Sequence, residues 1–150
     1  MFYEGVRLYY NEGTSLSVLF SNGVTKRYDV MDLAKTYKPL LALKDRKLFL
    51  KGKLNWYGIT WTDELDIGTD TIYYEGTTEE NREDAVEALL GFQVQYARLK
   101  KELTQEGLSN VSKMDQADIS KIENGKLSPT LNTIKRIARA LDTTITLTIK

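Results

Sequence analysis

The chain has 150 residues, 41% of them hydrophobic, which is enough for one domain or two small ones with packed cores. Its 21 Lys and Arg balance its 21 Asp and Glu, so the chain as a whole is not a basic nucleic-acid binder. It contains no Cys and no His, which excludes disulfides, zinc sites built from these residues, and Ser–His or Cys–His catalysis. We therefore expect no enzyme activity, no catalytic residues, no cofactor and no metal.

Apolar runs are short throughout. None approaches the roughly 18 residues of a membrane span, and the first ten residues lack the charged-then-apolar layout of a signal peptide. We expect a cytoplasmic protein that does not bind membranes.

Residues 3–75 predict a β-rich domain. An apolar run at residues 16–20 and a second run at residues 24–30 flank Ser21-Asn22-Gly23, and Asn-Gly between two such runs is a strong hairpin signal. A short helix is predicted within residues 32–42, and Pro39 indicates that it ends or breaks at Lys38. Further strands are predicted at residues 47–54, 58–62 and 72–74.

This first half resembles the family DUF2442, a small bacterial domain of unknown function. The resembling stretches are residues 17–30 with the Asn22-Gly23 turn, residues 43–49, residues 58–61, Asp66-Ile67 and Ile72-Tyr73. Members sometimes precede a helix-turn-helix, so the resemblance implies a fold and an arrangement, but no activity.

An aromatic cluster, Trp56, Tyr57 and Trp61, stands beside the acidic residues Asp63, Glu64, Asp66 and Asp70. Carboxylates near aromatic rings can form a sugar-cleaving pair or a hard-metal site, but no spacing here matches a calcium loop. Our interpretation is that core aromatic residues cap a sheet and the acids lie in a solvated loop.

The sequence predicts a domain boundary at Gly76-Thr77-Thr78, giving domains 1–76 and 77–150. Thr77 followed by Glu80 is a capping-box pattern, so a helix is expected to begin there. Gly91 is expected to kink or split this helix, which then continues to Lys101.

Residues 103–142 contain the most specific pattern of the chain. Thr104 and Asp115 can each cap a short helix, Ile119 and Ile122 form an apolar stripe, and Gly125 can end the second helix in the left-handed conformation. Two short helices joined by a tight turn, with polar residues exposed on the second, describe a helix-turn-helix.

This stretch resembles the Cro/repressor-type (Xre-like, lambda-repressor-like) helix-turn-helix proteins. The matching residues are Thr104-Gln105, Leu108, Ile119-Ser120, residues 122–125, residues 129–131 and residues 137–141. Ser109 stands where the family usually has Ala, and Lys113 where it usually has a turn Gly; a left-handed Lys costs roughly 1 kcal/mol. The resemblance also implies a structural ion pair between Arg98 and Glu123.

By position in the family motif, Gln116, Ala117 and Lys121 are expected to face bases, and Gln105, Asn124 and Lys126 to face phosphates. Gln suits adenine and Lys suits guanine in the major groove. Residues 98–150 carry ten Lys and Arg against six Asp and Glu, which agrees with a local DNA-facing surface. Asp118 is the residue that this interpretation leaves unexplained.

The last helix is expected to open at Pro129-Thr130-Leu131, and the tail, residues 144–150, alternates apolar residues and threonines as a strand does. A single strand needs a partner. It could join the N-terminal sheet, or it could pair with its twin across a two-fold axis, as in some antitoxin-type members of the family. We favour the second, a homodimer that reads two half-sites.

The sequence thus predicts an α+β protein with a β-rich N-terminal domain, an all-α helix-turn-helix domain and a terminal strand. The expected function is sequence-specific binding of double-stranded DNA, as a transcriptional regulator that inserts the helix at residues 115–124 into the major groove. Two alternatives remain open: an antitoxin-type autorepressor that binds a toxin, and a protein-binding adaptor with a degenerate helix-turn-helix. In the regulator, the N-terminal domain would sense a ligand, bind a protein partner or extend the dimer interface.

Overall fold

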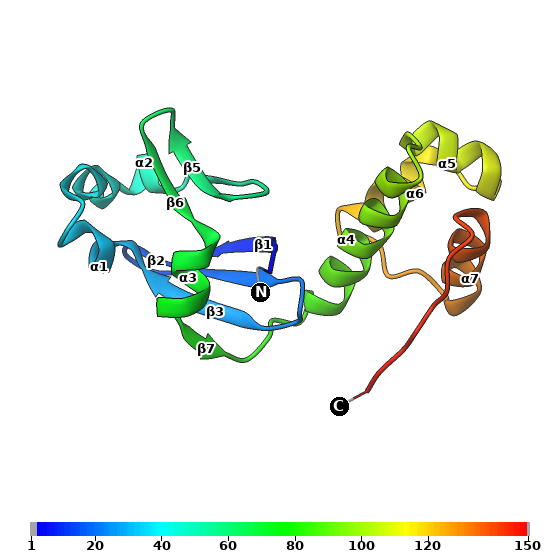
Figure 1. The fold of residues 1–150 in the computed structure, drawn as a ribbon, viewed down its shortest axis with the longest axis horizontal. Helices are drawn as coiled ribbons and strands as arrows, with labels where there is room; N and C mark the ends of the chain where they lie inside the picture. Colours follow the sequence, from blue (N-terminus) through cyan, green and yellow to red (C-terminus); the bar gives the residue numbers. More distant parts are fainter. Residues whose placement is uncertain (1–2, 150) are drawn as a thin grey trace. The chain divides into compact units, whose positions relative to one another are not determined.

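The structure, a computed structural model, describes residues 3–149 and divides into two compact units (Figure 1). The N-terminal unit ends at Glu83 and the C-terminal unit begins at Asp84. The division therefore lies after Glu83 rather than after Gly76. The first unit contains every strand in the described part of the chain and the second is helical, so the α+β class predicted from the sequence is confirmed.

The N-terminal unit combines two antiparallel sheets with short helices. Its elements, in chain order, are β1 (Gly5–Tyr10), β2 (Ser15–Phe20), β3 (Thr25–Asp29), α1 (Val30–Ala34), the 3-10 helix η1 (Lys38–Lys44), α2 (Arg46–Phe49), β4 (Lys53–Leu54), β5 (Gly58–Thr62), β6 (Leu65–Gly68), α3 (Thr69–Glu75) and β7 (Thr77–Glu79). One sheet has the order β1-β2-β3-β7 and the other β4-β5-β6.

The predicted hairpin is the centre of the larger sheet. β2 and β3 pair from Ser15 opposite Asp29 to Leu19 opposite Thr25, and Gly23 supplies the positive φ of 86° that the turn needs. The five residues 16–20 of β2 are all buried, because a central strand is covered on both faces. Leu16, Val18 and Phe20 belong to one continuous core with Phe49, Ile59 and Ile72.

Two aromatic side chains, one on each sheet, hydrogen-bond to carbonyls in and just after α2. Trp61 Nε1 donates to the Phe49 carbonyl at 2.7 Å, and the Tyr10 hydroxyl donates to the Gly52 carbonyl at 2.6 Å. Burial raises the pKa of Tyr10 to about 12, so this hydroxyl keeps its proton. The predicted aromatic cluster of Trp56, Tyr57 and Trp61 does not form one core group. Trp61 is part of the core, whereas Trp56 is 78% exposed.

Several predicted elements of this unit are wrong. Residues 47–54 form the helical turn α2 before the short strand β4, because the Asp45 carboxylate accepts from Lys47 N and starts a helix. Residues 72–74 lie inside α3, an example of a short apolar run that does not distinguish strand from helix. The helix predicted at residues 32–42 is two pieces: α1 starts early because Asp29 caps it, and Pro39 opens η1.

Residues 77–79 form the edge strand β7 of the larger sheet, so the helix predicted to start at Thr77 is wrong. β7 pairs with β3, and the segment after it is held by side chains: Thr25 Oγ1 donates to Asn81 Oδ1 at 2.6 Å, and Arg82 Nη2 donates to Asn11 Oδ1 at 2.7 Å. The Arg82 guanidinium also lies 4.4 Å from the centre of the Tyr9 ring.

The C-terminal unit consists of α4 (Ala85–Lys100), α5 (Gln105–Ser112), α6 (Gln116–Glu123) and α7 (Leu131–Ala140). Its core contains the buried side chains Val94, Leu108, Ile119, Ile122, Ile137 and Leu141.

Gly91 does not kink α4, which is continuous for 16 residues. A Cβ atom there would lie 2.4 Å from the Ile122 carbonyl oxygen and 2.6 Å from that of Glu123. The glycine therefore lets the α4 backbone approach the end of α6. The prediction of a break is wrong because this glycine serves helix packing and does not interrupt the helix.

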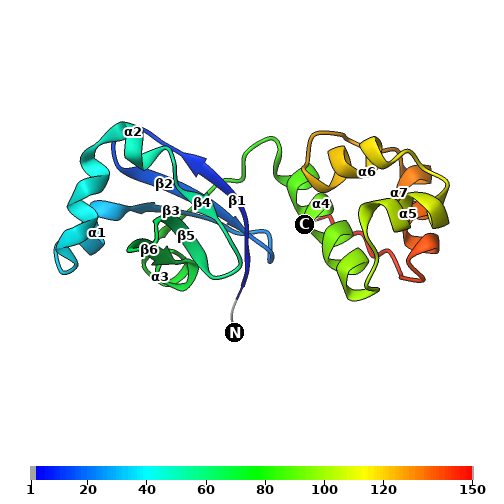
Figure 2. The same cartoon turned by 90° about the horizontal axis from the view of Figure 1, so that it is seen from above.

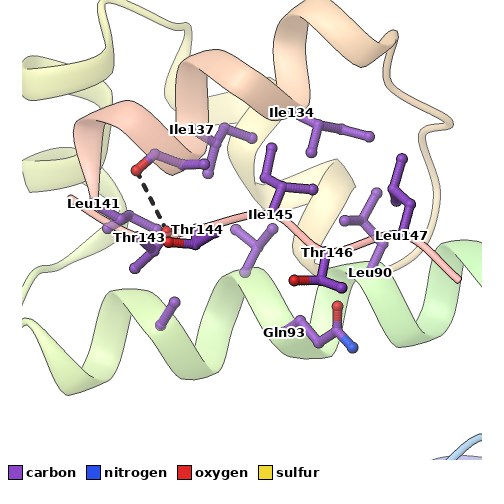
Figure 3. Close-up of a pocket in the computed structure, with 13 residues that line it drawn as sticks. Leu90, Gln93, Ile134, Ile137, Leu141, Thr143, Thr144, Ile145, Thr146 and Leu147 are labelled. Carbon is purple, nitrogen blue, oxygen red and sulfur yellow. Dashed lines mark hydrogen bonds between the residues drawn. The ribbon is translucent and has the colours of Figure 1, made fainter.

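The described residues of the tail, 143–149, form no strand. α7 ends with Asp142 in the left-handed conformation (φ 51°), and Thr143 N donates to the Ala138 carbonyl at 2.9 Å. Figure 3 shows the tail running between α7 and α4 over a pocket of about 190 Å³ lined mostly by apolar side chains, among them Leu90, Val94, Ile134, Ile137 and Ile145.

We predict that Gly91→Ala lowers the free energy of unfolding by about 1–3 kcal/mol, because the added methyl group meets backbone atoms that cannot move independently. Gly107→Ala in α5 is the matched control. Its new Cβ would meet only side-chain atoms, at 3.3 Å, and alanine favours the helix by up to about 1 kcal/mol. Urea denaturation followed by circular dichroism measures both; equal stability of the two variants would contradict the close approach.

Candidate nucleic-acid interface

The polar face of α6 is exposed, as the sequence predicts. Gln116, Ala117 and Lys121 are all exposed, while Ile119 and Ile122 on the opposite side are buried in the core. A helix anchored by one apolar stripe presents its other residues to solvent. The three residues predicted to face bases therefore lie on the accessible side of this helix.

Both ends of α6 are capped by the residues that the sequence indicates. The Asp115 carboxylate accepts from Ala117 N at 3.0 Å at the start. At the end, Gly125 has a φ of 68°, Gly125 N donates to the Ile122 carbonyl, and Lys126 N donates to the Lys121 carbonyl. Asp115 thus caps a free backbone N–H at the start of α6, which explains why an acid stands on the surface predicted to face DNA.

The turn before α6 is held by side chains of two helices, α5 and α7. Lys113 has a left-handed φ of 59°, at the position where glycine is usual in the family. Arg136 of α7 donates through Nε to the Ser112 carbonyl at 2.8 Å and through Nη2 to the Lys113 carbonyl at 3.0 Å. Ser109 Oγ donates to the Met114 carbonyl at 2.6 Å. These bonds satisfy carbonyls that the end of α5 leaves unpaired.

Arg136 was missed by the sequence reasoning. It lies on the last helix, 23 residues from Lys113, and nothing local to the turn indicates it. The signal that could have found it is the unusual lysine itself, because a strained turn needs compensating contacts.

A buried ion pair fixes α6 against α4. Arg98 Nε donates to Glu123 Oε1 at 2.6 Å and Nη2 donates to Oε2 at 3.0 Å, with side-chain exposures of 8% and 3%. The remaining guanidinium nitrogen, Nη1, donates to the Leu103 carbonyl at 2.7 Å. The predicted Arg98–Glu123 pair is confirmed, and its bidentate geometry restricts both side chains.

Two of the predicted phosphate-facing residues have partners inside the unit. Gln105 is half-buried, and its Nε2 donates to Glu123 Oε2 at 2.9 Å. The Asn124 amide donates to the Ser120 carbonyl at 2.8 Å at the end of α6. Lys126 is exposed one turn further on. Asp118 lies 3.9 Å from Lys121 Nζ, so its charge is partly compensated on the helix surface.

The acids beside the aromatic cluster do not converge. Within residues 3–149, no group of three or more His, Cys, Asp or Glu side chains is placed to hold a metal ion. No helix in the same range is long and apolar enough to cross a membrane.

Comparison with known proteins finds two family models, one for each unit. Residues 94–147 match the helix-turn-helix family and residues 6–78 match the protein family of unknown function DUF2442. No curated protein matches the chain.

Solved structures also show similarity. At 31% identity and a TM-score of 0.36, 37% of this chain aligns with 83% of the restriction-modification controller protein C.AhdI from Aeromonas hydrophila and with 70% of the controller protein C.Esp1396I. A putative DNA-binding protein from Nitrosomonas europaea aligns over 91% of this chain and 82% of its own, at 14% identity and a TM-score of 0.36.

The exposed polar helix, its caps, the tight turn and the family model define a helix-turn-helix protein of the DNA-binding class. Residues 94–147 are a helix-turn-helix domain, and residues 6–78 are a DUF2442 domain.

We predict that Arg98→Met or Glu123→Leu alone destabilises the C-terminal unit by roughly 3–5 kcal/mol, because each leaves a buried charge without its partner. The double variant Arg98→Met/Glu123→Leu should be more stable than either single variant, since no unpaired charge remains. Thermal unfolding of the four proteins gives the coupling energy. Additive losses would show that the pair does not act as a unit.

Proposed function

We propose that this protein is a transcriptional regulator that binds a specific sequence of double-stranded DNA with α6 in the major groove. The observation that carries the proposal is the set of exposed side chains on α6, Gln116, Ala117 and Lys121, on a helix held by the buried Arg98–Glu123 pair. A rigid scaffold beneath exposed polar residues is what base recognition requires, because each base contact depends on a fixed side-chain position.

The roles of the individual residues follow from their chemistry. Gln116 can make a bidentate contact with adenine, Lys121 can donate to guanine O6 and N7, and Ala117 can contact a thymine methyl group. Lys126 is free to contact a phosphate beyond the end of α6. Gln105 would contact a phosphate through the Nε2 hydrogen that does not bind Glu123. Asn124 Nδ2 donates to the Ser120 carbonyl and lies 3.3 Å from Ser120 Oγ, so a phosphate contact by Asn124 would replace one of these bonds.

We predict that Gln116→Ala/Lys121→Ala loses at least about tenfold of the preference for the cognate over a scrambled duplex, since each base contact discriminates by about 1–3 kcal/mol. Fluorescence anisotropy on the DNA upstream of the gene and on scrambled DNA, at two salt concentrations, measures this. The matched control is Gln95→Ala/Lys100→Ala, which removes the same two residue types from the exposed side of α4.

Each outcome has a distinct meaning. Unchanged preference in the α6 variant would overturn base readout by this helix. Absence of binding by the wild-type protein to any duplex at low salt would replace the proposal with a protein-binding adaptor.

We further propose that the protein works as a homodimer joined through its tails. Residues 144–149 have extended sequence character but no strand partner within the described chain, and Leu147 and Ile149 are 71% and 100% exposed. Antiparallel pairing of two tails would satisfy their backbone groups and cover these side chains. A two-fold dimer would then present two α6 helices to half-sites about 34 Å apart.

We predict that Leu147→Asp/Ile149→Asp lowers the mass measured by sedimentation equilibrium towards the 17.1 kDa of one chain. Charges on the apolar side of the tail would prevent its burial. Thr146→Asp/Thr148→Asp adds the same charge on alternate positions and should retain the dimer. A monomeric wild-type protein at micromolar concentration would contradict the proposal.

A further inference from the structure

Positive charge in the N-terminal unit is concentrated in one segment, residues 38–53, which we name the basic lobe. It contains six Lys and Arg and one Asp, whereas the rest of the chain up to Glu83 contains five Lys and Arg and twelve Asp and Glu. The lobe comprises η1, α2 and β4, and η1 packs against both α1 and α2. Figure 2 shows α1 and α2 together at one end of this unit. The unit is therefore acidic as a whole, and most of its basic residues belong to the basic lobe.

The lysines of the basic lobe are available to an external anion. They are Lys38, Lys44, Lys47, Lys51 and Lys53, and all five are exposed. Within residues 3–149, none of them has a carboxylate oxygen within 4.0 Å, unlike Lys35, whose Nζ lies 2.8 Å from Asp32.

The other two charged residues of the lobe are used internally. Arg46 Nη1 donates to the Gly13 carbonyl at 2.6 Å, and the Asp45 carboxylate accepts from Lys47 N at the start of α2. The one acid of the lobe is therefore held by a helix end and pairs with none of the five lysines.

An open groove adjoins two of these lysines. Lys51 and Lys53 line a groove of about 900 Å³ together with the polar side chains of Asn55, Tyr57 and Thr60, and Asp63 is the one carboxylate among its lining residues. Trp56, 78% exposed, lies beside it with its ring 5.2 Å from that of Tyr57. Exposed lysines without carboxylate partners can donate to the phosphates of a duplex.

We propose that the basic lobe is a second DNA-contacting surface, which binds the phosphate backbone without reading its sequence. The inference rests on the proposed DNA binding by the helix-turn-helix unit, because that unit brings a dense polyanion to the same chain. The N-terminal unit as a whole is acidic, so only the basic lobe can face phosphates favourably. Its contribution would increase affinity equally for cognate and scrambled duplexes, because phosphates are common to both.

The test compares two variants of the full-length protein with equal charge change. Lys51→Gln/Lys53→Gln removes two charges from the basic lobe, and Lys26→Gln/Lys35→Gln removes two from elsewhere in the N-terminal unit. Affinity for upstream and scrambled duplexes is measured by anisotropy from 50 to 200 mM salt.

The lobe variant should lower the slope of log affinity against log salt by about 1.8, since each phosphate contact contributes about 0.9. Across this fourfold salt range, its affinity should then fall about 12-fold less than that of the wild type. The Lys26→Gln/Lys35→Gln control should keep the wild-type slope, and both variants should keep the preference for the upstream duplex.

Two outcomes would overturn the second surface: equal slopes for the wild type and the lobe variant, or an equal decrease of the slope in the lobe variant and the control variant. Neither outcome requires that the basic lobe contacts phosphates. Failure of the proposed function is distinguishable from failure of the second surface. If the wild type binds both duplexes equally and the lobe variant still has the lower slope, base readout by α6 is rejected and phosphate binding by the basic lobe is retained. Binding of the wild type to neither duplex would overturn both.

Discussion

The C-terminal unit depends on one buried ion pair. Arg98 comes from α4 and Glu123 from the last turn of α6, and their bidentate contact fixes the rotation of α6 about its own axis. A buried pair of this kind is not in itself a large source of stability, because both charges lose their hydration. Its value lies in specificity: any other packing of α6 on α4 would leave a charge buried and unpaired. Because the ion pair fixes the rotation of α6, it also determines which side chains of α6 are exposed to solvent.

The surrounding residues agree with this constraint. Gly91 has no side chain at the point where α4 meets the Ile122 and Glu123 carbonyls, so the two helices come close enough for the ion pair to form. Gln105 donates to the same carboxylate from the start of α5. At the other end of α6, the strained turn at Lys113 is held by Arg136 and Ser109. Both ends of α6 are thus fixed by contacts with neighbouring elements.

The accuracy of the sequence predictions differs between the two units for a physical reason. In the helix-turn-helix, the caps Thr104 and Asp115 and the left-handed Gly125 are local signals, and the structure confirms each. In the N-terminal unit, the hairpin at Asn22-Gly23 is equally local and was found. Residues 47–54 and 72–74 were not, because short apolar runs fit a helix and a strand alike, and tertiary packing decides between them. The positions of Arg136 and Gly91 against distant segments could not be predicted from local pattern at all.

The central proposal is that the exposed side chains of α6 recognise the DNA sequence. Selection of bound duplexes from a random pool tests this proposal most directly. Bound duplexes would be sequenced, and guanine N7 methylation within the enriched sequence would then be tested for interference with binding. We predict a defined motif in which methylation of major-groove guanines prevents binding, because the proposed contact of Lys121 uses guanine N7. A pool that remains random after selection, or a motif insensitive to N7 methylation, would contradict major-groove recognition by this helix.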